Sequence, residues 1–209
     1  DDIRRGTPTY IGTKHFTPLA VKECVEDRTI ERRYDSSKDV GTGMRETSNL
    51  DLHADLREAD WYIYDENYGT SEEKALVKFI ESQVSALRER FSNVYLLRNE
   101  KLFQLYNFDD GRPLEPDFVL FGTEIDTGKA VSYQIFIEPK GPHLVANDLW
   151  KEDFLQQIED EQKITVERRA QDFRLVGLPF FNRDEKRDQF EEKFKKVLLN
   201  PAQPLPDES

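Results

Sequence analysis

Two short apolar segments on either side of a tight turn constrain this chain more than any other feature. Residues 118–121 and 131–137 have the length and apolar character of buried strands. The residues between them, Asp126-Thr127-Gly128-Lys129, are typical of a turn. The pattern therefore predicts an antiparallel hairpin inside a sheet.

Acidic residues stand where the two predicted strands end. Pro116-Asp117 comes directly before the first strand, and Glu138-Pro139-Lys140 follows the second. If the turn centres on residues 127 and 128, Asp117 lies opposite Glu138 on one face of the sheet. Directly opposed Cβ atoms are about 4.5–5.5 Å apart, a distance at which like charges repel. Folding alone does not explain such a pair, whereas a bound Mg²⁺ would relieve the repulsion.

Other interpretations of these residues stay open. A one-residue bulge would change the register and place the two carboxylates on opposite faces of the sheet. Asp117 could simply begin a strand, and Glu138 with Lys140 could form a solvent-exposed pair on one strand face. Because the three residues together bracket two apolar strands, they favour a functional site over these separate roles.

Helices are predicted before and after the hairpin. Thr70 and Glu73 form a capping box that begins a helix extending to about residue 91. Amphipathic spacing predicts two later helices, at about 147–159 and 184–199. The predicted fold class is α/β, with a mixed central sheet flanked by helices. Further strands are predicted at residues 61–64, 94–97, 102–108 and 173–181.

The charge and the apolar pattern limit the partners of the chain. It has 42 acidic and 30 basic residues and a net charge of −12. A domain that holds DNA by neutralising phosphates is normally basic, so we expect this chain to bind DNA weakly by itself. No apolar run reaches the roughly 18 residues of a membrane span. With the single cysteine, Cys24, these features favour a reducing, cytoplasmic setting without a membrane partner.

The residues at the hairpin ends carry a family resemblance. Pro116-Asp117 followed by Glu138-Pro139-Lys140 resembles the signature of PD-(D/E)xK nucleases. The surrounding sequence is similar to the C-terminal endonuclease domain of the restriction (Res) subunit of type III restriction–modification enzymes. The likeness runs from about residue 61 to 199 and implies a PD-(D/E)xK restriction-endonuclease-like core. The similar phrases are residues 114–118, 136–141, 150–155 and 177–180.

The resemblance implies a Mg²⁺-dependent endonuclease that hydrolyses DNA phosphodiester bonds. Asp117 and Glu138 would bind the metal, with the Pro139 carbonyl as a further ligand. Lys140 would orient the attacking water, help to deprotonate it or stabilise charge on the phosphorane; beside two carboxylates it is expected to stay protonated. Glu73 is our candidate for an additional acidic residue from the first helix, with its role in the capping box as an equal alternative.

Weaker candidates for DNA binding lie beyond the hairpin. His143 follows Lys140 closely enough to contact a phosphate or water, and Arg168-Arg169 could contact the DNA backbone. A lone histidine in a loop is more often structural, and a charge run usually only solvates a face of the protein.

The resemblance also implies the partners and the domain organisation. The partners would be DNA, a methyltransferase (Mod) subunit and a helicase or translocase domain of the parent polypeptide. ATP would act only through that domain, because the chain has no GxxxxGK[ST] loop. We therefore expect a connecting or docking segment at 1–60 that follows a helicase domain, an endonuclease domain at 61–200 and a tail at 201–209. The expected compartment is the bacterial or archaeal cytoplasm.

Two other functions remain alternatives. The same core could serve a repair or defence nuclease with different partners. The chain could also be a non-catalytic interaction module that docks a helicase to its complex. An intact set of Asp117, Glu138 and Lys140 favours catalysis, since a degenerate site is expected to lose at least one of them.

Overall fold

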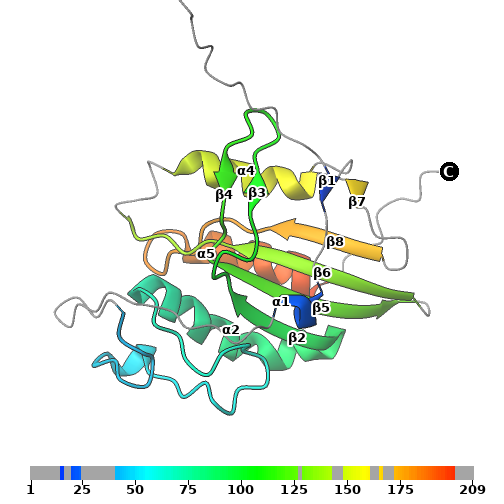
Figure 1. Cartoon of the computed structure of the whole chain (residues 1–209). Helices are drawn as coiled ribbons and strands as arrows, with labels where there is room; N and C mark the ends of the chain where they lie inside the picture. Colours follow the sequence, from blue (N-terminus) through cyan, green and yellow to red (C-terminus); the bar gives the residue numbers. More distant parts are fainter. Residues whose placement is uncertain are drawn as a thin grey trace, which may run out of the picture.

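A four-stranded mixed sheet organises the chain (Figure 1). Its strand order is β2-β5-β6-β8, in which β5 pairs antiparallel with both β2 and β6, and β8 pairs parallel with β6. The predicted strands at 94–97, 118–121 and 131–137 are confirmed within longer strands. The bounds are β2 Phe91–Arg98, β5 Phe118–Asp126, β6 Lys129–Ile137 and β8 Asp172–Gly177.

The computed structural model describes seven segments of the chain. They are residues 15–16, 20–24, 41–126, 129–142, 148–160, 165–166 and 172–200. Within these segments, no helix combines the length and the hydropathy that a membrane span requires.

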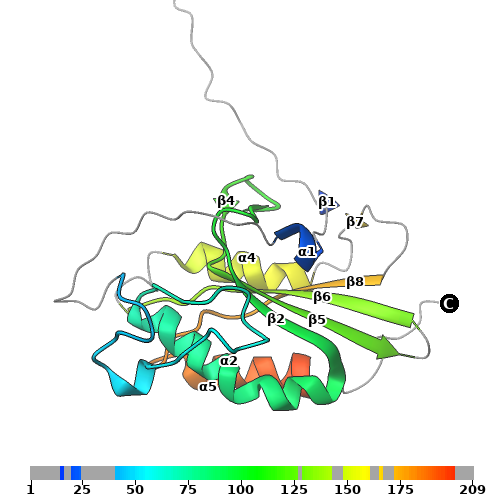
Figure 2. The same cartoon turned by 60° about the horizontal axis from the view of Figure 1, so that its bottom comes forward.

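Helices cover both faces of the sheet, as Figure 2 shows. Helices α2 (Ser71–Arg90) and α5 (Arg187–Phe194) lie on one face, and a π-helical turn at Lys195–Leu199 continues α5. Helix α4 (Leu149–Asp160) and the short α1 (Val21–Cys24) lie on the other. The predicted mixed α/β architecture is thus confirmed.

Side-chain alternation along β5 gives the domain two hydrophobic cores. Phe118 and Leu120 pack in the cluster on the α2 side, whereas Val119 and Phe121 pack in the cluster on the α4 side. Since neighbouring side chains of a strand point to opposite faces, a strand covered on both sides must be apolar throughout. This explains the continuous apolar run at residues 118–121.

The predicted register and helix start are both confirmed. Phe118 lies opposite Ile137, and the pairing continues without a bulge to Asp126 opposite Lys129. Helix α2 begins after Thr70, whose side chain accepts a hydrogen bond from the Glu73 backbone while the Glu73 carboxylate accepts one from the Thr70 backbone.

Two predicted strands are wrong in extent. At 61–64 the chain makes only an isolated bridge between Tyr62 and Leu96. At 102–108 only β3 (Leu105–Tyr106) is a strand, and it pairs with β4 (Pro113–Leu114). The amides of residues 102 and 103 donate instead to the side chain of Asn99, so they make no strand ladder.

The last predicted strand and helix are shorter than expected. The strand predicted at 173–181 ends at Gly177, close to Pro179, which has no amide hydrogen to donate to a ladder. The helix predicted from residue 184 begins at Arg187, because the Asn182 side chain accepts hydrogen bonds from the amides of residues 184 and 185. The short elements that remain are β1 His15–Phe16, β7 Thr165–Val166 and the 3₁₀ turn Leu50–Leu52.

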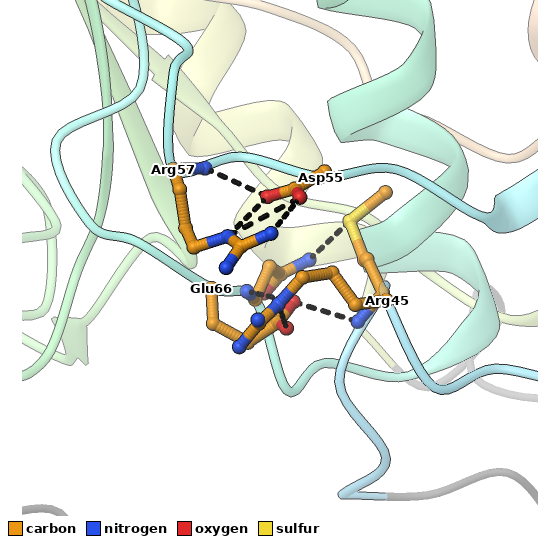
Figure 3. A network of polar contacts seen from close by, with 6 residues as sticks. Arg45, Asp55, Arg57 and Glu66 are labelled. Carbon is orange, nitrogen blue, oxygen red and sulfur yellow. Dashed lines mark hydrogen bonds and ion pairs between the residues drawn. The ribbon is translucent and has the colours of Figure 1, made fainter.

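Residues 41–68 pack on the sheet and α2. Met44 and Leu56 are buried in the core cluster of α2, so this part of the expected connecting segment belongs to the core of the domain. Polar contacts hold the segment together (Figure 3). The Glu66 carboxylate accepts hydrogen bonds from the Met44 backbone at 2.7 Å and from Arg45 Nε at 2.9 Å. Asp55 accepts from Arg57 beside them.

Candidate active site

Asp117 and Glu138 meet where β5 begins and β6 ends. The register that pairs Phe118 with Ile137 places the two acidic residues opposite each other. The backbone amide of Asp117 donates to Glu138 Oε2 at 3.0 Å, which ties one acidic residue to the other. Glu138 is 2% exposed, so its charge lies inside the protein.

Asn99 fixes the backbone that leads into Asp117. Its side-chain amide donates to the carbonyl oxygens of Pro116 and Phe103, both at 2.8 Å. Its backbone amide donates to the Asp117 carbonyl at 2.8 Å. Sequence reasoning missed this residue, because nothing in the sequence indicates that an asparagine after β2 contacts the start of β5.

Phe181 fixes the backbone on the other side of the site. Its amide donates to the Glu138 carbonyl at 3.1 Å, and its carbonyl accepts from the Lys140 amide at 2.9 Å. Pro139 pairs with Phe181 in the parallel bridge between these bonds. The segment after β8 therefore extends the sheet by one bridge and aligns Glu138 with Lys140.

Lys140 lies between two carboxylates. Its Nζ is 2.9 Å from Glu138 Oε1 and 2.9 Å from Asp148 Oδ2. Burial by itself would lower the pKa of Lys140, but the charge of Glu138 and hydrogen bonds to Glu138 and Asp148 raise it above its ordinary value. Lys140 is therefore a protonated ammonium at neutral pH.

The ionised form of Asp117 is disfavoured at this site. Burial, followed by the charges of Glu138 and Glu73, raises the pKa of Asp117 to about 8, although Lys140 and Arg98 act in the opposite direction. An acid whose ionised form is disfavoured by neighbouring carboxylates is stabilised by a cation. Such perturbed groups gather at functional sites.

The charge of Glu73 acts on Asp117, but the Glu73 carboxylate already has hydrogen-bond partners of its own. Its carboxylate accepts hydrogen bonds from the Thr70 backbone and from Arg98, whose Nη2 is 2.9 Å away. Arg98 in turn contacts Asn67 and Glu100. Both alternatives from the sequence thus have a basis, since Glu73 caps α2 and its charge acts on Asp117.

The described residues offer few protein ligands for a metal ion at this site. Among the described residues, no group of three or more His, Cys, Asp and Glu side chains has an arrangement that could hold a metal ion. Asp117 and Glu138 offer two hard-oxygen ligands, and Mg²⁺ is commonly bound by one or two carboxylates while it keeps several waters. Such an ion would offset both causes that raise the pKa of Asp117, first its burial and then the repulsion by Glu138 and Glu73.

The weaker DNA-binding candidates cannot be related to this site. His143, Arg168 and Arg169 lie outside the residues that the structure describes. The structure instead adds Asp148 and Lys151 from the start of α4, which sequence reasoning did not single out. Lys151 Nζ is 3.1 Å from Asp148 Oδ2 and 3.8 Å from Glu138 Oε1.

Comparison with known proteins places the chain in a family. Residues 9–203 match the family described as HI_1054_C, C-terminal domain. The chain belongs to this family. An uncharacterised protein from Haemophilus influenzae (strain ATCC 51907 / DSM 11121 / KW20 / Rd) is 38% identical to it over 196 residues. That alignment covers 90% of this chain and 39% of the relative, so the chain spans well under half of the relative's length. No solved structure matches this chain.

Proposed function

We propose that this chain is a Mg²⁺-dependent endonuclease domain that hydrolyses DNA phosphodiester bonds. The observation that carries the proposal is the convergence of Asp117, Glu138 and Lys140 at neighbouring ends of β5 and β6. The mixed sheet with helices on both faces is compatible with the PD-(D/E)xK restriction-endonuclease-like core that the sequence resembles.

Each residue has a role in this proposal that follows from its environment. Asp117 and Glu138 would hold Mg²⁺, with the Pro139 carbonyl as a third ligand from the protein. When bound, the ion would lower the pKa of a water molecule and polarise the phosphoryl oxygen. Because Lys140 is protonated, it would donate a hydrogen bond that orients the attacking water or stabilises charge on the phosphate.

The wider assembly is part of the same proposal. A net charge of −12 is poorly suited to holding DNA without help. The relative extends far beyond the matched region, which leaves room for further domains in such a polypeptide. We propose a type III restriction-like organisation, in which a helicase domain uses ATP and a methyltransferase subunit recognises the DNA, in a bacterial or archaeal cytoplasm.

Metal titration combined with a nicking assay tests the proposal. Mg²⁺ and Mn²⁺ are titrated calorimetrically into the 209-residue chain and into its Asp117→Asn and Glu138→Gln variants, and nicking of supercoiled plasmid is measured on each protein. Asp60→Asn is the matched control, since Asp60 is 74% exposed and pairs with a surface arginine, Arg88. We expect both site variants to lose metal binding and nicking, and the control to retain them.

The other results separate the alternatives. Metal binding without nicking supports the metal site, and the nicking assay is then repeated with the full-length parent polypeptide. If the wild-type chain binds no metal, the endonuclease proposal fails and the non-catalytic docking module becomes the better account.

A further inference from the structure

Four charged side chains, two acidic and two basic, form a cluster at the N-terminus of α4. Lys140 bridges Glu138 and Asp148, and Lys151 lies 3.1 Å from the same Asp148 oxygen and 3.8 Å from the same Glu138 oxygen. Two ammonium groups therefore share two carboxylates. Since both Nζ atoms contact Asp148 Oδ2, they lie close enough together to contact one small anion.

Metal binding would change the balance of these charges. If Glu138 turns its oxygens toward Mg²⁺, as the proposed function requires, the two lysines keep Asp148 as their shared carboxylate. A phosphate group that enters the site would supply the second anionic partner. Lysine is a frequent phosphate-binding residue, acting as a point charge rather than as a planar fork.

The open side of the cluster is the side of α4. The Lys151 side chain is 23% exposed and that of Asp148 is 24% exposed, against 12% for Lys140 and 3% for Glu138. Lys151 also stands in the first turn of the 12-residue helix α4, where the helix dipole favours an anion. A DNA strand approaching from solvent would thus meet Lys151 before it reaches Lys140.

We propose that Lys151 is a phosphate-binding residue of this site, and that it holds the scissile phosphate of DNA from the α4 side together with Lys140. This inference rests on the proposed nuclease function and adds to it the position of the DNA backbone. Asp148 stays paired with both lysines, and the phosphate takes the place that Glu138 leaves when it turns toward the metal.

The test compares Lys151→Met and Lys151→Arg with a matched control. Lys78→Met is that control, because Lys78 pairs with Glu81 at the same three-residue spacing on a helix and lies on α2, away from the cluster. Binding of a short fluorescent DNA duplex is measured in Ca²⁺ over a range of salt concentrations, with Mg²⁺ titration and plasmid nicking on the same proteins.

We expect Lys151→Met to bind the duplex roughly tenfold or more weakly, since it loses one charge-assisted contact. The plot of log affinity against log salt concentration should become less steep by about 0.9, which is the contribution of one phosphate contact. In Lys151→Met, the Mg²⁺ affinity should stay unchanged, and nicking should fall together with duplex binding. Lys151→Arg should recover part of the duplex binding and of the nicking. Lys78→Met should match the wild type in all of these measurements.

Three results would overturn the inference. If Lys151→Met binds and nicks DNA like the wild type while Asp117→Asn does neither, the nuclease proposal stands and the role of Lys151 fails. If Lys151→Met loses Mg²⁺ affinity, Lys151 supports the carboxylates rather than the phosphate. If the wild type binds no duplex even at the lowest salt concentration, Lys151 holds no phosphate and the inference fails; if it also binds no metal, the proposed function fails with it. Circular dichroism identifies any misfolded variant, and Lys151→Gln then replaces it.

Discussion

The ionised form of the Asp117 side chain is less stable in the folded chain than in the unfolded chain. Its pKa rises to about 8, through burial and through the charges of Glu138 and Glu73, from an ordinary value of about 3.8. Between these values the folded state binds the proton that the unfolded state releases. The contribution of Asp117 to the free energy of unfolding is therefore lost as the pH rises through this window.

Asp117→Asn should consequently stabilise the metal-free protein at pH values near 8. Asparagine keeps the shape of the side chain and removes the charge, so we expect a gain of at least about 1 kcal/mol there. The gain should shrink as the pH falls toward the ordinary pKa of aspartate, because below it Asp117 is neutral in both the folded and the unfolded state. Urea denaturation of both proteins across this range, with a chelator present, measures it. An equal difference at every pH would contradict the prediction.

A variant of Glu73 distinguishes the two roles proposed for this residue, which are capping α2 and supporting the metal site. Glutamine can replace glutamate in a capping box, so Glu73→Gln should keep the start of α2 while it loses the ion pair with Arg98. We expect metal affinity to stay nearly unchanged, because Thr70 and Arg98 already use the carboxylate oxygens. Calorimetric titration decides the point. A loss of metal affinity of roughly tenfold or more would show that Glu73 contributes to metal binding, as expected for a group that acts on the metal ligands.

At the scale of elements, the contact of α4 with β8 depends on a glycine. A Cβ atom built on Gly177 would lie 1.8 Å from the backbone oxygen of Leu155, a distance that no side-chain movement can relieve. This close approach lets α4 lie low on the sheet, and the first turn of the same helix carries Lys151 into the site.

Gly177→Ala should therefore destabilise the chain by about 3 kcal/mol, the upper range for overpacking a core. Gly141→Ala is the control, because a Cβ atom there meets nothing within 4 Å. Chemical denaturation of both variants gives the comparison. Equal stability of the two variants would show that α4 can shift away from β8 at little cost.

At the scale of the whole molecule, Arg90 connects segments that are far apart in sequence. From the end of α2 it donates to Glu124 on β5 at 2.6 Å and to Tyr133 on β6 at 2.8 Å. It also donates to the carbonyl oxygens of Val197 and Leu198, at 2.6 and 3.0 Å. One guanidinium group thus joins the helix, two strands and the C-terminal turn.

Arg90→Met should cost about 2–3 kcal/mol of stability, because it leaves the partly buried Glu124 carboxylate without its cationic partner and removes a donor from two carbonyl oxygens. Arg88→Met is the matched control on the same helix, since its ion pair with Asp60 is exposed and should be worth at most about 1 kcal/mol. Thermal unfolding of the two variants separates these costs. A smaller loss for Arg90→Met than for Arg88→Met would contradict this account.

Local patterns predicted much of this architecture correctly. The turn at residues 126–129 and the apolar runs on either side of it predicted the pairing of Phe118 with Ile137, because a hairpin register follows from its turn. Thr70 and Glu73 predicted the start of α2, because a capping box involves only neighbouring residues. The opposition of Asp117 and Glu138 follows from the same register.

Contacts between segments that are far apart in the chain could not be predicted from the sequence. Asn99 and Phe181 fix the two backbones of the candidate site, yet neither lies near Asp117 or Glu138 in the chain. The same side-chain hydrogen bonds of Asn99 shorten the strand predicted at 102–108, since they satisfy amides that a ladder would otherwise use. A pattern of apolar residues carries no information about such competition.

The hairpin, its register, the start of α2 and the pairing of two acidic residues could be predicted from the amino-acid sequence, because each depends on turns, caps and alternation within a short stretch of chain. The parallel pairing of β8 with β6, and the position of α4 that brings Asp148 and Lys151 to Lys140, could be seen only in the folded domain. Those arrangements depend on how helices pack on the two faces of the sheet, and packing joins residues that are far apart in the chain.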